Sequence, residues 1–221
     1  LLNVSTLVPI FLITIPLGIA TALKKGSRFD TGVQIFTIVG YSLPFFVIAI
    51  LFIYIFAVLL GWFPVSGTGT PDFQGTVWEG ILDRLHYMAL PAMVIVFSSL
   101  GGLTRYVRTA MIEALSMDCI KTARAKGLRE KVVIYSHAFR NALIPFITVV
   151  AGWFIGIFGG SVVIERTFLW RGMGNTLVTS MMQLDYMVAM AMLMFYLLLS
   201  LAGNLIIDLL YGAVDPRVKL S

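Results

Sequence analysis

The chain has 221 residues, of which 59% are hydrophobic and only 12% are charged, and its formal net charge is +5 at pH 7. Soluble domains are roughly 45–50% apolar and about 25% charged. This composition excludes an ordinary soluble domain and indicates an integral membrane protein. The one cysteine, Cys119, excludes an internal disulfide and a cysteine metal cluster.

Five stretches are long enough to cross a bilayer, since a spanning helix needs roughly 20 mostly apolar residues. They cover about 4–23, 33–60, 85–103, 142–164 and 186–211. The first contains Pro9 and Pro16, and Pro91 lies near the start of the third. Pro44 is an expected kink in the second. The sequence therefore predicts an all-α, polytopic helical bundle.

Basic residues concentrate on one side of these five predicted spans. The segments that follow the first span, join the third to the fourth and follow the fifth hold 13 of the 16 lysines and arginines. Positive charge marks cytoplasmic loops, so we expect these segments and the C-terminus in the cytoplasm and Leu1 outside. The net charge is thereby accounted for, and we expect no nucleic-acid partner. The sequence begins with Leu1 and shows no basic n-region or cleavage site before its first apolar run, so we expect no signal peptide there. We interpret residues 1–221 as one transmembrane domain, the C-terminal portion of a longer chain.

Two loops are expected on the outer side. Residues 61–84 include Trp62 and Trp78, which suit an interfacial segment with aromatic anchors. Residues 165–185 are mixed and amphipathic. They are interpreted either as a short helix that dips toward a pore or as a plain surface connection, with the second preferred.

Residues 116–145 are basic and polar in a chain that is otherwise apolar. Ser116 is the expected N-cap of a short helix, and Asp118 in its first turn suits the helix dipole. Gly127 is the expected left-handed stop, with the apolar Leu128 just beyond it. A helix of about 8–10 residues is marginal alone in water, so it needs a surface to pack against.

Small side chains at Thr122, Ala123 and Ala125 would let another backbone approach this short helix closely. Beyond it, apolar residues recur at helical spacing as far as Leu143, which predicts an amphipathic helix running back to the membrane. Composition alone leaves two interpretations open. The segment either docks a partner protein or binds anionic lipid headgroups through its basic side chains.

Motifs across most of the chain resemble those of ABC-transporter permeases. The run KTARAKGL followed by HAFRNALIP is similar to their EAA loop, and more narrowly to that of oligopeptide, dipeptide and nickel import permeases. The segments YSLPFF, GWFPVSG, LPA, TRYVRTAMIEAL, GGSVVIERTF and NLIIDLLYGAVDPR agree in order. Lys121 and Thr122 stand where the general motif has Glu and its first Ala, and Pro145 lies further from Gly127 than in that motif.

The resemblance implies a fold like that of type I ABC importer permeases, with residues 104–145 as the cytoplasmic EAA-type loop. Its short helix would be the coupling helix, seated in a groove of an ATPase subunit, through which rigid-body movement reaches the spans. The resemblance assigns this ATPase contact to Asp118, Lys121, Thr122, Ala123, Arg124, Ala125, Lys126, Gly127 and Leu128.

The resemblance also implies the function and the partners. The chain would be the membrane-spanning permease of an ATP-driven importer that receives peptides or a related small solute from an extracytoplasmic binding protein. A second homologous permease and two cytoplasmic ATP-binding subunits would complete it in a bacterial or archaeal cytoplasmic (inner) membrane. Dipeptides, oligopeptides, glutathione, nickel and nickel chelates remain open as solutes, as do a homodimer and a heterodimer of permeases.

The sequence carries no pattern of a catalyst. It lacks G-x-x-x-x-G-K-[ST], so nucleotide chemistry must come from a partner. His86 and His137 show no zinc spacing, and no serine or cysteine nucleophile motif occurs. We expect a non-catalytic transport subunit with no catalytic residue, metal or cofactor. The alternative is a secondary transporter driven by an ion gradient, which usually needs carboxylates inside its spans.

A few residues are candidates for a gate, a pathway or a helix contact. Asp208 is the clearest carboxylate within a span, with Asn204 one turn before it, and Glu165 begins the second outer loop. Asp208 either lines a pathway or makes an interhelical hydrogen bond, and the hydrogen bond is preferred. Three glycines repeat every four residues and predict tight helix packing, within this chain or against a second permease: Gly152, Gly156 and Gly160.

Overall fold

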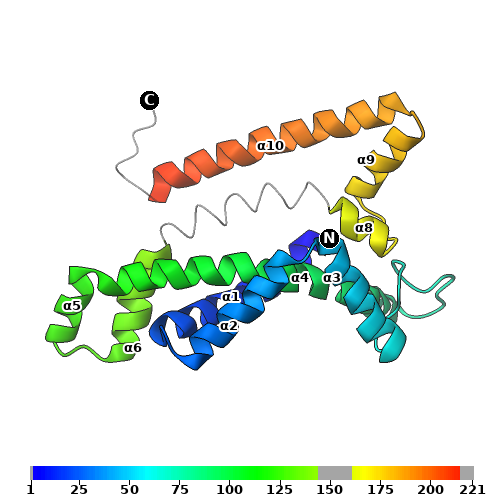
Figure 1. The fold of residues 1–221 in the computed structure, drawn as a ribbon. Coiled ribbons are helices and arrows are strands. Elements are labelled where there is room, and N and C mark those ends of the chain that lie inside the picture. The colour runs from blue at the N-terminus through cyan, green and yellow to red at the C-terminus, as the bar shows by residue number, and fades with distance from the viewer. Residues whose placement is uncertain (1, 144–160, 215–221) are drawn as a thin grey trace.

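The computed structural model describes residues 2–143 and 161–214, although the side chains of 207–214 are outside the description. Its described residues form helices and no strand (Figure 1). The elements are α1 (Leu2–Leu23), α2 (Arg28–Ser42), α3 (Phe45–Phe52), η1 (Ile53–Leu59), α4 (Val77–Ser116), α5 (Asp118–Ala125), α6 (Glu130–Val132), η2 (Val133–Phe139), α8 (Val162–Thr167), α9 (Met173–Met182) and α10 (Tyr186–Val214). The π-helical turns η1 and η2 continue α3 and α6.

The long helix α4 is the axis of the described structure. Its 40 residues span about 60 Å at 1.5 Å per residue. A capping box starts it, because the Thr76 hydroxyl accepts a hydrogen bond from the Glu79 amide while the Glu79 carboxylate accepts one from the Thr76 amide. The helix contains the predicted span 85–103 and extends beyond it at both ends, so the predicted outer loop 61–84 is helical from Val77 onward.

Helices α1 and α2 lie against α4 at points of close approach (Figure 1). A Cβ added at Gly18 of α1 would come within 2.6 Å of the Val107 side chain, and one added at Gly101 of α4 within 2.5 Å of the Thr37 carbonyl oxygen. Small residues allow such approach between membrane helices. The sequence prediction placed glycine packing instead at Gly152, Gly156 and Gly160, which lie outside the described residues.

The second predicted span is broken at the expected proline. The chain bends by 104° between helix α2 and helix α3–η1, at Leu43 and Pro44. Leu43 is extended (φ −77°, ψ 136°), as the residue before a proline prefers. The position of the kink is confirmed, and its size makes it a break between two helices.

Three helices in the described part of the chain, α1, α4 and α10, are long and apolar enough to cross a membrane, and the bent pair would be a fourth if it counts as one span. These three helices and the bent pair coincide in position with four of the five predicted spans. The remaining prediction, 142–164, falls largely on residues outside the description.

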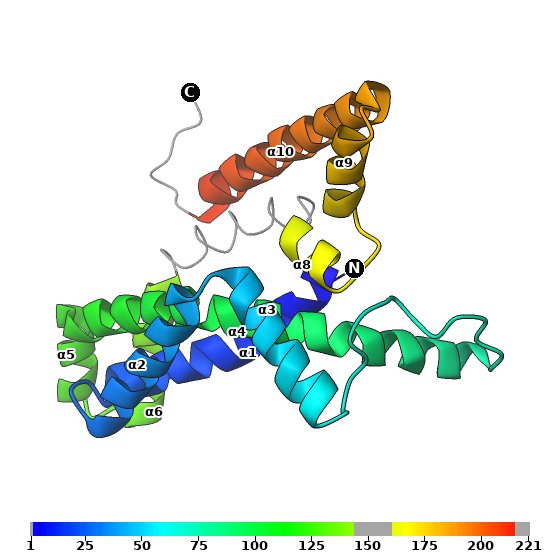
Figure 2. The ribbon, with the colours of Figure 1, turned by 45° about the vertical axis from the view of Figure 1, so that its right-hand side comes forward.

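The described C-terminal part is joined to the first helices through α8. Ile164 and Phe168 are buried in an apolar cluster with Ile48 of α3 and Leu90 of α4, which holds α8 on the first helices. Figure 2 shows α9 and α10 as a hairpin that leads away from α8. Residues 173–182 are helical, which contradicts the preferred interpretation of 165–185 as a plain connection.

Candidate functional site

The short helix α5 forms where the sequence places it, although its start differs. Ser116 still belongs to α4, and its hydroxyl donates to the Glu113 carbonyl oxygen at 2.6 Å. Met117 (φ −65°, ψ 147°) is the N-cap, a residue with no oxygen to offer the helix amides. The prediction of Ser116 as N-cap is wrong because α4 continues through it. Asp118 lies in the first turn as expected, where its charge suits the helix dipole.

The end of α5 confirms the predicted stop at Gly127. The backbone there is left-handed (φ +74°), a conformation that glycine adopts without a Cβ penalty. The Gly127 amide donates to the Arg124 carbonyl at 2.9 Å, and the Leu128 amide donates to the Ala123 carbonyl at 3.3 Å. These two bonds are the pair that defines a Schellman motif. The turn after α5 is therefore specified by local sequence.

The inner face of α5 is anchored in the protein. Ile120 is 0% exposed and Ala123 is 4% exposed, and both belong to one apolar cluster with residues of α1, α4 and η2. Because Ala123 is occupied by internal packing, the small residues left on the outer surface are Thr122 and Ala125. The structure thus changes the expected docking surface, in which Ala123 had a part.

The outer face of α5 is polar and exposed, and two ion pairs order it. Lys121 Nζ lies 2.8 Å from Asp118 Oδ1. Arg124 Nη2 lies 2.7 Å from Glu130 Oε1, and Arg124 Nε donates to Glu130 Oε2 at 3.3 Å, so the end of α5 is tied to the start of α6. This pairing holds the pKa of Glu130 below its usual value and raises the pKa of Arg124. Lys126 is also exposed and makes no ion pair with another described residue.

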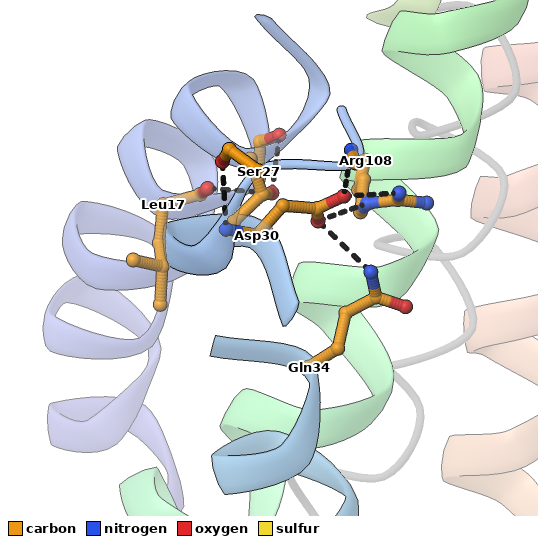
Figure 3. Close-up of polar contacts among 8 residues, drawn as sticks. Leu17, Ser27, Asp30, Gln34 and Arg108 are labelled. Atoms are coloured by element: carbon orange, nitrogen blue, oxygen red, sulfur yellow. Dashed lines mark hydrogen bonds and ion pairs between the residues drawn. The ribbon is translucent and has the colours of Figure 1, made fainter. Parts of the chain in front are cut away.

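A buried ion pair close to α5 was not predicted from the sequence. Asp30, in the first turn of α2, accepts bonds from Arg108 Nε and Nη2 of α4, both at 2.7 Å (Figure 3). Gly26 N and Gln34 Nε2 also donate to its carboxylate, each at 2.9 Å. The run SRFD beginning at Ser27 has the S-x-x-[DE] spacing of a helix start, and this signal could have identified Asp30 as a capping residue. It could not have named Arg108.

The predicted gate residues are not gathered at one place. Glu165 is 6% exposed and its carboxylate accepts bonds from the Asn175 amide at 2.7 Å and the Ser161 amide at 3.3 Å. It therefore caps α9, whose own N-cap, Gly172, has no side chain. Asn204 is exposed and lies 18 residues beyond Tyr186, about 27 Å along α10. The side chain of Asp208 is outside the described residues.

The chain is similar to known transport proteins over nearly all its length. The model of the family described as binding-protein-dependent transport system inner membrane component matches residues 14–220. The oligopeptide transport system permease protein AppB of Bacillus subtilis is 41% identical over 219 residues, covering 99% of this chain and 68% of that protein. The di/tripeptide transport system permease protein DppB of Pseudomonas aeruginosa is 36% identical, covering 91% and 64%. A putative peptide transport system permease of Brucella abortus is 39% identical, covering 95% and 66%. The chain thus spans about two thirds of the length of these relatives.

Proposed function

Because the chain belongs to the family of binding-protein-dependent transport system inner membrane components, we propose that it forms part of the membrane pathway of an ATP-driven importer for peptides. Membership confirms the resemblance drawn from the motifs, the helical membrane fold and the prediction of a non-catalytic transport subunit. The relatives are named for oligopeptides and for di- and tripeptides. Those names favour peptides over the nickel that the motifs left open.

Within this function α5 is the coupling helix. The observation that carries the assignment is the division of α5 into two faces. Its inner face, Ile120 and Ala123, lies in the same apolar cluster as Ile19 of α1 and Met111 of α4. Its outer face is exposed and charged. Force applied to the outer face would therefore be passed to α1 and α4 rather than absorbed by a loose loop.

The proposed role also implies the partner subunits of the importer. A second homologous permease would complete the pathway, two cytoplasmic ATP-binding subunits would supply hydrolysis, and an extracytoplasmic binding protein would deliver the peptide. The membrane is the cytoplasmic (inner) membrane of a bacterium, with α5 and the C-terminus on the cytoplasmic side. An ion-gradient mechanism gains no support from the buried carboxylates of the described residues, since Asp30 is paired with Arg108 and Glu165 caps α9.

A bulky side chain on the outer face of α5 tests the coupling role. Ala125→Trp adds an indole to an exposed position and leaves the buried face untouched. Ser136→Trp adds the same group to an exposed position of η2 and serves as the matched control. We expect Ala125→Trp to reduce both co-purification of the ATPase subunits and peptide uptake about tenfold or more, a loss of binding of about 1.4 kcal/mol.

The control variant should bind the ATPase and take up peptide like the unmodified protein. The coupling assignment is wrong if Ala125→Trp does so too. Absence of peptide uptake by the unmodified complex, or failure of any ATPase subunit to bind it, would contradict the importer function itself.

A further inference from the structure

We propose that the Asp30–Arg108 ion pair is the positioning element that makes α1, α2 and α4 follow α5 as one body, and so sets how much transport each ATP hydrolysis yields. This inference rests on the importer function and on the coupling role of α5. It concerns two residues that lie 78 positions apart in the chain. Asp30 belongs to α2 and Arg108 to α4, and the hydrogen bonds described for the pair join these helices and the α1–α2 turn, so the pair acts through the helices that it joins.

The carboxylate of Asp30 is fully engaged. Oδ1 accepts bonds from Arg108 Nε and Gln34 Nε2, and Oδ2 accepts bonds from Arg108 Nη2 and Gly26 N. The Asp30 side chain is 2% exposed and that of Arg108 is 18% exposed. A two-bond fork between a guanidinium and a carboxylate fixes orientation as well as distance. The pair therefore holds α2 against α4 at a defined height and rotation.

The pair is placed where movement of α5 enters the membrane helices. Arg108 lies eight residues before Ser116, the last residue of α4, which is about 12 Å along the helix. A single residue, Met117, separates α4 from α5. On the other side, Asp30 lies just after the tight turn from α1 into α2, and the Gly26 amide of that turn is one of its donors. The pair thus links the α1–α2 turn to the last turns of α4, and this link is called the brace below.

Apolar contacts alone would not give the same brace. The faces of α1 and α4 meet through side chains such as Ile19 and Val107, and packed helices of this kind can slide over one another by small shear movements. Between membrane helices, apolar packing also gains little from the hydrophobic effect, because lipid is equally apolar. The directional hydrogen bonds of the pair oppose such sliding. Without them, movement of α5 would be taken up between α4 and its neighbours.

The test compares three variants in the whole complex, reconstituted in lipid with its ATPase subunits and binding protein. Arg108→Lys keeps the charge but loses the two-bond fork. Asp30→Asn removes the charge. The double variant Asp30→Leu with Arg108→Met replaces the pair by apolar side chains, which often leaves stability unchanged or raised. The readout is the number of ATP molecules hydrolysed per peptide transported, measured together with thermal stability.

A positioning role predicts that all three variants use at least about fivefold more ATP per peptide, including a double variant as stable as the unmodified complex. Asp83→Asn is the control, since Asp83 accepts two bonds from Thr70 on an exposed surface at the opposite end of α4. It should leave the ratio unchanged. The inference is overturned if the stable double variant, or Arg108→Lys, keeps the original ratio, because the pair would then serve stability alone. An unmodified complex that hydrolyses no ATP on peptide delivery would instead contradict the importer function on which the inference rests.

Discussion

Truncating Ile120 should release α5 from the protein without disturbing its outer face. Ile120 is 0% exposed and is packed in the cluster shared by α1, α4, α5 and η2. Replacement by Ala removes three carbon atoms, worth about 2.4 kcal/mol at 0.8 kcal/mol per buried methylene group, and the cavity left behind raises the cost to about 2.5–4 kcal/mol. The eight residues of α5 are too few to hold a helix by themselves. The loss should therefore appear as local opening of α5.

Hydrogen exchange of the α5 amides measures this opening directly. Since 1.4 kcal/mol corresponds to a factor of ten, Ile120→Ala should speed exchange of these amides about 60- to 700-fold, while amides in the middle of α4 stay within a few fold of their original rates. Thr122→Ala, on the exposed side of the same helix, is the matched control and should change exchange little. Exchange of α5 in Ile120→Ala within threefold of the unmodified protein would refute the reasoning that internal packing holds the helix.

Two further predictions concern the helix contacts and the turn after α5. Gly101→Ala would bring a Cβ within 2.5 Å of the Thr37 carbonyl oxygen, so it should destabilise the α2–α4 contact by about 1–3 kcal/mol and lower the melting temperature. Gly102→Ala is the control and should not lower it, because a Cβ there would have nothing within 4 Å. Equal melting temperatures of the two variants would contradict the close approach. The bonds from Arg124 lower the pKa of Glu130 below its usual value of 4.5. The ion pair therefore stabilises the turn fully at pH values above 4.5, and this stabilisation is lost as the pH falls through the lowered pKa. Exchange of the 126–129 amides should therefore depend on pH in the acidic range in excess of the intrinsic rate, and Glu130→Gln should abolish that excess; an unchanged dependence would exclude the pair as its cause.

Local chemistry in the sequence was sufficient for several features of the chain. Hydropathy predicted α1 and α10, Pro44 predicted a kink in the second span, and Gly127 predicted the end of α5. Each depends on residues within a few positions along the chain, which is why pattern and propensity suffice. The motifs of the 116–145 stretch were likewise sufficient to indicate the family, because they are read directly from the order of residues.

Other features depend on how distant segments pack, and only the tertiary structure decided them. The partner of Asp30 is Arg108, and nothing local to either residue names the other. Helical spacing shows that Ala123 shares a face with Ile120, but it took the placement of η2 and α4 to make that face the inner one. Glu165, a candidate gate by its charge alone, caps α9 because the fold of residues 165–175 returns the Asn175 amide to it. Composition and short-range rules thus determined that this chain spans a membrane and that a short helix ends at Gly127. The packing of helices far apart in sequence decided which charges are buried together and which face of α5 remains exposed.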